Sequence, residues 1–152
     1  MIALALAAAA IAVPPAEAAT IFTVAGFRKA GGEWRTDCGA PGNGSYEPGA
    51  IDTYRDLNGD GRPEAVVTEG STFCYGNTGT GFRLLSKQAG GGWRKLYESP
   101  GIAEFVKARG AVNMPDLSVG GPGFCFPVLR WNGKTYVQNR FEYEGRPCRP
   151  PR

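Results

Sequence analysis

The stretch FRLLSKQAGGGWR, residues 82–94, contains the pattern on which this chain is built. A run of residues that favour β-strands is followed by a basic residue, a glycine-rich turn and a tryptophan. An earlier stretch, FTVAGFRKAGGEWR at residues 22–35, repeats this order, and VLRWNGKTYV at residues 128–137 is a shorter version of it. Glycines adopt the positive φ angles of tight turns, and the aromatic residue that follows can pack on the returning strand. Each stretch therefore predicts an antiparallel β-hairpin, with Asn132-Gly133 as a two-residue turn in the last.

The hairpins belong to two weakly similar units, at about residues 20–79 and 80–140. In each unit the hairpin is followed by an Asp-Leu pair and then by a Phe-Cys pair: Asp56-Leu57 and Phe73-Cys74, then Asp116-Leu117 and Phe124-Cys125. Repeats of this kind stack as sheets or as propeller-like blades. We therefore predict one small, mainly β domain of antiparallel hairpins. The alternative is that Gly-Gly-x-Trp recurs by chance in a glycine-rich chain.

The composition agrees with many short strands. Among 152 residues there are 23 glycines and 12 prolines, which excludes a helical bundle, and the 8 Phe, 6 Tyr and 3 Trp argue against disorder. The chain contains no histidine, so Ser-His and Cys-His dyads and histidine zinc sites are excluded. The net charge of +3 is modest, and we expect no nucleic-acid partner and a monomer.

The N-terminal segment resembles a secretory signal. Residues 2–13 are apolar but too few to span a bilayer, and Ala16-Glu17-Ala18 has the small-x-small form of a cleavage site. We predict a signal peptide at residues 1–18, no membrane span, and a secreted or periplasmic domain at residues 19–152. The alternative for the apolar segment is a buried, alanine-rich helix.

Four cysteines follow the predicted signal peptide, an even number that indicates two disulfides in an oxidising compartment. Four cysteines allow three connectivities. Because Cys74 and Cys125 occupy matching places in the two units, we predict a Cys74–Cys125 bridge. Cys38 and Cys148 would then form the second bridge.

One short helix is expected over residues 99–110. Ser99 can cap its start, Pro100 suits the first turn, and Gly110 suits the end. Three apolar residues between them share one helical face: Ile102, Phe105 and Val106.

The stretch DLNGDGRPEAVV, residues 56–67, carries the most specific chemistry. Counted from Asp56, oxygen-bearing side chains fall at places one, three, five and nine, which are Asp56, Asn58, Asp60 and Glu64. Gly61 occupies place six, where such a loop turns sharply, and Arg62 at place seven can offer its carbonyl. Calcium prefers six to eight oxygen ligands and is commonly held by alternate residues of a tight loop. The alternative is an Asx turn whose side chains bind only the backbone.

This loop resembles the calcium loop of FG-GAP-type repeats, which occur in integrin-like β-propellers and in bacterial secreted proteins. The resemblance implies Asp56, Asn58, Asp60 and Glu64 as Ca²⁺ ligands, with Arg62 lending its carbonyl. It is strong over about a dozen residues, and the chain is too short for a complete propeller. The whole is similar to small single-domain bacterial envelope proteins with one such loop. The matching segment at Asp116 lacks the acid at place five and is expected to be metal-free.

An EF-hand places a bidentate glutamate at place twelve, and here that place is Val67, at the start of a predicted strand. Glu64, or Asp52 upstream, must supply the carboxylate ligand that Val67 cannot provide. The remaining acids show no paired spacing, and no nucleophile has an evident base beside it.

We therefore expect a non-enzymatic binding or interaction module with a structural calcium loop, whose partner is a protein or an envelope component. The first alternative is an inhibitor or envelope-guarding factor that binds a hydrolase such as a lysozyme. The second alternative is a small carboxylate-dependent hydrolase.

Overall fold

The computed structural model describes residues 12–152. The helices and strands, in chain order, are α1 (Pro15–Val24), β1 (Arg28–Ala30), β2 (Glu33–Arg35), β3 (Tyr46–Arg55), β4 (Glu64–Ser71), α2 (Thr72–Tyr75), β5 (Thr80–Lys87), β6 (Trp93–Pro100), β7 (Ile102–Arg109), β8 (Pro115–Gly120), β9 (Phe126–Trp131), β10 (Tyr136–Tyr143) and β11 (Arg146–Pro147). Short 3-10 turns, η1 (Asp37–Gly39), η2 (Gly76–Thr78) and η3 (Ala111–Asn113), lie between them.

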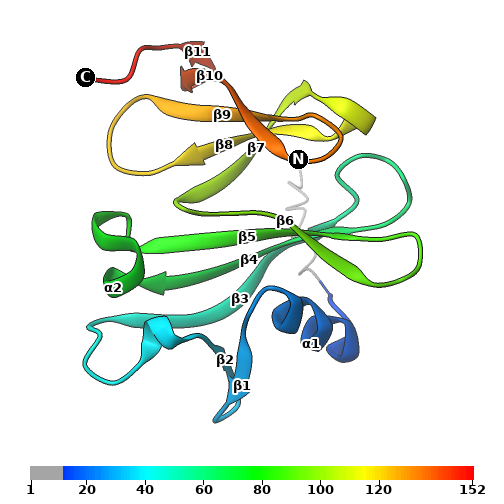
Figure 1. The fold of residues 1–152 in the computed structure, drawn as a ribbon, viewed down its shortest axis with the longest axis vertical. Helices are drawn as coiled ribbons and strands as arrows, with labels where there is room; N and C mark the ends of the chain where they lie inside the picture. The colour runs from blue at the N-terminus through cyan, green and yellow to red at the C-terminus, as the bar shows by residue number, and fades with distance from the viewer. Residues whose placement is uncertain (1–11) are drawn as a thin grey trace, which may run out of the picture.

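The strands form antiparallel sheets, as the sequence predicts. The first large sheet has the order β3-β4-β5-β6, the second has the order β11-β10-β9-β8-β7, and β1 and β2 form a separate hairpin. The two large sheets face each other (Figure 1). The chain passes from one to the other at Gly101, between β6 and β7, and the sheets curl like half of a barrel. No propeller is formed by residues 12–152.

Gly101 makes this corner because no other residue fits there. Its φ angle of 122° is unfavourable for side chains, and an added Cβ would lie 2.6 Å from the carbonyl oxygen of Gly120. The close approach joins the end of the first sheet to the edge of the second.

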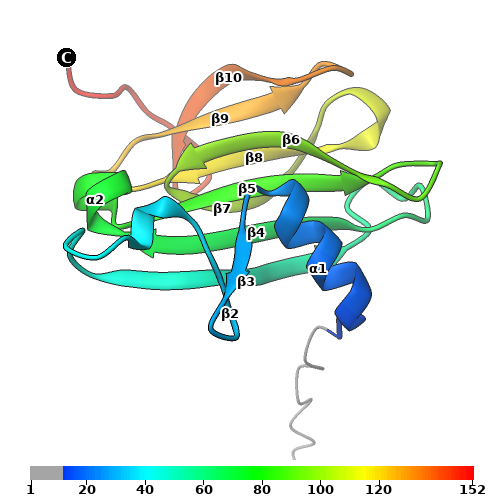
Figure 2. The same ribbon diagram turned by 60° about the horizontal axis from the view of Figure 1, so that its bottom comes forward.

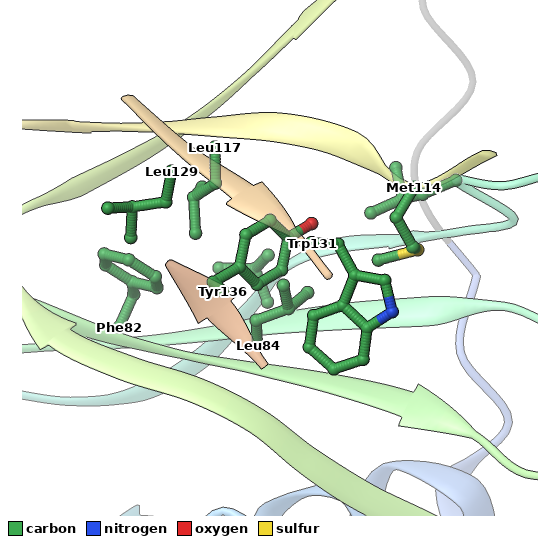
Figure 3. Close-up of a cluster of buried hydrophobic side chains, with 9 residues drawn as sticks. Phe82, Leu84, Met114, Leu117, Leu129, Trp131 and Tyr136 are labelled. Carbon is green, nitrogen blue, oxygen red and sulfur yellow. The ribbon is translucent and has the colours of Figure 1, made fainter. Parts of the chain in front are cut away.

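The main core lies between the two large sheets. Val66, Phe82 and Leu84 project from the first sheet and meet Leu117 and Leu129 of the second (Figure 3). Tyr136 lies in the middle of the same cluster, and Met114 and Trp131 close it at one end (Figure 3). Burial of this apolar surface is the main source of stability of the pair of sheets.

A second core covers the other face of the first sheet. Helix α1 lies across this face (Figure 2) and buries Ile21 and Phe22 against it. Val67 and Leu85 of the sheet complete the contact. Strands β4 and β5 are therefore buried on both faces, which explains the consecutive apolar residues Ala65-Val66-Val67 and Leu84-Leu85 at their centres.

A hairpin forms in each of the three predicted stretches, but the first covers only residues 28–35, because residues 22–24, predicted as part of a strand, belong to helix α1 and Phe22 packs on the first sheet. Strands β1 and β2 turn through Gly31 and Gly32, whose φ angles are 57° and 81°. Strands β5–β6 and β9–β10 form the other two. The last turn differs from the prediction: Trp131 pairs with Tyr136, so four residues make the loop, and Asn132 Oδ1 accepts the N–H groups of Lys134 and Thr135.

The helix predicted over residues 99–110 is wrong, because this segment contains strand β7. Ile102 pairs with Gly120 and Phe105 pairs with Leu117 of β8. The side chain of Ile102 is 61% exposed, whereas Ala103 and Phe105 pack on the main core. The β7–β8 pairing is irregular beyond Phe105, so buried and exposed side chains do not alternate strictly along β7. The resulting spacing of apolar residues resembles that of a helical face.

The predicted disulfide pairing is also wrong. The bridges join Cys38 to Cys74 and Cys125 to Cys148. The hydroxyl of Ser71 donates to the carbonyl of Cys38, which holds η1 beside the end of β4. Cys148 donates its N–H to Phe141 of β10, beside Cys125. Cys38 and Cys74 lie beside the first sheet, whereas Cys125 and Cys148 lie beside strands of the second, so each bridge closes within its own part of the fold.

The observed pairing predicts a specific peptide map. Proteolysis without reductant should release one linked pair with Cys38 and Cys74 and another with Cys125 and Cys148. Replacing Cys38 and Cys74 together by serine should lower the free energy of unfolding by about 2–4 kcal/mol, because the unfolded chain loses a constraint. A peptide that joins Cys74 to Cys125 would contradict this connectivity.

The predicted signal peptide, residues 1–18, lies mostly outside the described residues. The predicted cleavage point after Ala18 falls inside α1, where the carboxylate of Glu17 accepts hydrogen bonds from Lys87 Nζ at 2.7 Å and Trp93 Nε1 at 3.0 Å. Cleavage at this point stays a prediction. Among residues 12–152, no helix is both long enough and apolar enough to cross a bilayer.

Candidate functional site

The predicted calcium loop connects β3 to β4 at one end of the first sheet. Its turns depend on Gly59 and Gly61, which have φ angles of 78° and 84°. The side chains of Asp56, Asn58 and Asp60 each accept the backbone N–H two residues further along. These are Asx turns, which hold the loop in a tight coil.

Asp56 organises the coil. Its Oδ1 accepts the N–H of Gly59 at 2.8 Å, and its Oδ2 accepts the N–H of Gly61 at 2.8 Å. The hydrogen bond from Gly61 is the largest of several that lower the pKa of the Asp56 carboxyl below its ordinary value. Asp56 is therefore an ionised carboxylate at the start of the loop, and its Oδ2, which accepts one hydrogen bond, keeps a further lone pair.

Glu64 stands at the first position of β4 and is completely buried. Its Oε1 accepts the N–H of Leu57 at 2.8 Å, and its Oε2 accepts the hydroxyl of Ser86 at 2.9 Å. Burial raises the pKa of Glu64 above its ordinary value, and the negative charges of Asp60 and Asp56 raise it further against those two hydrogen bonds.

Glu64 differs from the other two buried acids in its lack of a cation. Glu69 pairs with Arg83, and Asp116 pairs with Arg130 and Arg140. Within residues 12–152, no lysine or arginine makes an ion pair with Glu64. An ionised carboxylate in such a place is costly unless a positive charge compensates it.

The donor set of the loop suits calcium in chemistry and spacing. Asp56, Asn58 and Asp60 present oxygen side chains on alternate residues, as Ca²⁺ loops do. Asp60 also pairs with the guanidinium of Arg62 at 3.0 Å. In the part of the chain that the structure describes, no three acidic or cysteine side chains converge as a ready metal site. The carboxylate of Glu64 is instead directed to Leu57 and Ser86.

Residues that the sequence did not indicate fix this loop to the second sheet. Arg109 Nη1 donates to the carbonyls of Leu57 at 2.7 Å and Asn113 at 2.8 Å. Asn113 Nδ2 donates to the carbonyl of Asn58 at 3.1 Å. Val112 and Asn113 have positive φ angles of 45° and 63°, a strained conformation that for a β-branched residue is rare. No local sequence signal predicts the contacts with Leu57 and Asn58, because they join residues more than fifty positions apart.

The matching segment of the second unit is not a loop. Asp116 lies in β8 with its side chain buried, and Arg130 donates to both of its oxygens, at 3.0 and 2.9 Å. Arg140 Nη1 donates to Asp116 Oδ2 at 2.6 Å. Burial alone would raise the pKa of Asp116, but these hydrogen bonds and charges outweigh it and lower the pKa. Its carboxylate is thus engaged by two arginines.

The fold gathers three acids that the sequence did not pair. Glu104, Glu142 and Glu144 line a hollow of about 330 Å³ with Phe126 and Tyr143. Glu142 pairs with Arg140, and the other two glutamates are exposed to solvent. None of the three stands in the dry surroundings in which carboxyl groups act as general acids.

Comparison with known proteins gives no relative: no family model, no curated protein and no solved structure matches the chain.

Proposed function

We propose that this protein is a secreted or periplasmic, non-enzymatic binding module whose loop at residues 56–64 holds a structural calcium ion. The side chains of Asp56, Asn58, Asp60 and Glu64 and the carbonyl of Arg62 are the proposed ligands. Bound Ca²⁺ would neutralise the negative charge that these acids concentrate at one end of the first sheet.

The observation that carries this proposal is the buried carboxylate of Glu64. It is completely buried, the charges of Asp60 and Asp56 disfavour its ionisation, and within residues 12–152 it has no cationic partner. A divalent cation held by the loop supplies that partner. Calcium suits the site better than Mg²⁺, because Mg²⁺ demands strict octahedral geometry and retains its waters.

The surrounding fold supports a structural role for the ion. Arg109 and Asn113 connect the loop backbone to the second sheet, so a rigid loop also holds the two sheets together. The first sheet, β3-β4-β5-β6, is a four-stranded antiparallel meander, which is the topology of one propeller blade. This likeness accords with the resemblance of the loop to FG-GAP-type repeats.

The absence of histidine, the exposure of Glu104 and Glu144 and the ion pair of Glu142 with Arg140 favour binding over catalysis. The partner we propose is a protein or envelope component. The two disulfides suit an oxidising compartment.

Calcium should stabilise the purified protein. At one hundred times its dissociation constant, Ca²⁺ should add about 2.7 kcal/mol to the free energy of unfolding. This corresponds to a rise of about 10 °C in the thermal midpoint for a domain of this size. The measurement compares metal-depleted protein with and without Ca²⁺ by differential scanning calorimetry.

The Glu64→Gln variant separates calcium binding from a simple Asx turn. Without calcium this variant should be at least as stable as the wild type, because it removes a buried charge that lacks a partner, yet it should lose the calcium-induced shift. Asp37→Asn is the matched control, since Asp37 is an exposed acid with a side chain 89% accessible. It should keep the shift. An equal midpoint with and without Ca²⁺ in the wild type would contradict the metal assignment.

A further inference from the structure

A second hollow, of about 250 Å³, lies beside the calcium loop where the two large sheets meet. Three cationic side chains line it: Arg55 from the end of β3, and Lys107 and Arg109 from β7. Leu57 and Phe105 form part of its wall. We name it the Arg55–Arg109 pocket.

The three cations of this pocket are free of ion pairs in the described part of the chain. Several other cations make ion pairs, as Arg28 does with Asp37 and Lys95 does with Glu98, and this hollow differs in bringing together three cations that are unpaired within residues 12–152. The one acid at the edge of the pocket is Asp56, whose carboxylate is occupied by N–H groups of its own loop. The pocket thus concentrates uncompensated positive charge, which draws anions.

Arg109 is held in place before any ligand arrives. Its Nη1 donates to the carbonyls of Leu57 and Asn113, while Nε and Nη2 make no hydrogen bond within residues 12–152. A guanidinium fixed in this way presents its remaining donors in a planar fork, which matches the spacing of oxyanion oxygens. Little side-chain freedom is then lost on binding.

We propose that the Arg55–Arg109 pocket binds the phosphate group of a small phosphate monoester. A monoester carries about −1.5 to −2 charges at neutral pH and three acceptor oxygens, so it uses three cations better than a carboxylate does. Leu57 and Phe105 offer an apolar wall to the carbon part of the ligand. The pocket is smaller than the range of about 300–1,000 Å³ that is common for drug-sized ligands, and it suits a compact molecule.

This proposal does not depend on calcium binding, because none of the three cations is a proposed metal ligand. The test therefore uses metal-depleted buffer without a chelator, so that it stands whether or not the loop binds Ca²⁺. Isothermal titration calorimetry with phenyl phosphate should show saturable binding. Inorganic phosphate, which cannot contact the apolar wall, should bind more weakly.

Two double variants of equal net charge provide the comparison. Arg55→Gln with Lys107→Gln should weaken phenyl phosphate binding by about tenfold or more, because two charged donors leave the pocket. Arg149→Gln with Arg152→Gln removes two exposed arginines of the C-terminal tail and should leave the affinity unchanged. Both variants should keep the thermal midpoint of the wild type, since all four side chains are exposed.

Three results would overturn the proposal. The first is no saturable binding of phenyl phosphate by the wild type at millimolar concentration. The second is an equal loss in both double variants, which would indicate general charge attraction only. The third is co-sedimentation with phosphatidylcholine vesicles that contain phosphatidic acid without any binding of phenyl phosphate, which would assign the cations to a membrane surface.

Discussion

The Glu69→Ala variant should lose about 3–5 kcal/mol of folding free energy, because it leaves the buried charge of Arg83 without its partner. The side chain of Glu69 is fully buried and that of Arg83 is 13% exposed. Glu69 accepts hydrogen bonds from Arg83 Nη1 at 2.9 Å, from Tyr75 at 2.6 Å and from Tyr46 at 2.7 Å. Urea denaturation, with the slope checked for constancy, measures the loss.

Glu98→Ala is the control for this substitution. Glu98 also faces Arg83, with Oε2 3.8 Å from Nε, but its side chain is 54% exposed. Exposed pairs contribute about 0–1 kcal/mol, so this variant should stay close to the wild type. Equal losses in the two variants would show that burial of Glu69 does not matter.

The pH dependence of stability tests the contact between Glu69 and Arg83 in a second way. Burial alone would raise the pKa of Glu69, but the hydrogen bonds from Tyr75, Tyr46 and Thr36 and the charge of Arg83 together lower it below its ordinary value of 4.5. A lowered native pKa stabilises the fold above the unfolded-state pKa, and this contribution is lost as the pH falls through the native pKa. When the pH falls from above 4.5 to below the native pKa of Glu69, the Glu69→Ala variant should therefore lose less stability than the wild type.

The Phe82→Ala variant should destabilise the protein by about 3–5 kcal/mol, because it opens a cavity between the two sheets. Phe82 is 1% exposed and belongs to the main core, where its ring lies 6.2 Å from that of Tyr97. The core is supported from both sheets and cannot collapse onto a missing ring without moving strands. The denaturation midpoint in urea should fall accordingly.

Phe73→Ala is the matched control for the core substitution. Phe73 lies in α2 with 66% of its surface exposed. Its removal should change the free energy of unfolding by less than about 0.5 kcal/mol. A loss at Phe73 as large as that at Phe82 would contradict the placement of the core.

Local signals were sufficient for the hairpins but not for β7. At Gly31 and Gly32 the required φ angles belong to glycine itself, so the turn could be predicted from two residues. At Ile102 and Phe105 the apolar spacing fits a helix or an irregular strand equally well. Pairing with Gly120 and Leu117 of β8 decides between them, and no signal within β7 itself predicts that pairing.

The candidate site also combines local features, which the sequence predicts, with features that need contacts between distant residues. The Asx turns of Asp56, Asn58 and Asp60 follow from side chains that bind their own backbone two residues on, so the loop is local. Other features of the site require two distant segments to come together. They are the burial of Glu64 without a cationic partner within residues 12–152, the hydrogen bond from Arg109 to Leu57, and the hollow that Arg55 and Lys107 both line.

Residue types and their order were enough to predict the mainly β class, the three hairpin turns, the presence of two disulfides and the oxygen-rich loop. The number of disulfides follows from the even count of cysteines, and the other features depend on residue types and on spacings within about a dozen positions, where backbone preferences act directly. The tertiary structure alone decided which cysteines join, which acids have cationic partners, and that residues 102–109 extend as a strand. These features depend on which surfaces become buried against each other. The packing of the two sheets around Phe82 and Leu117 determines which segments meet.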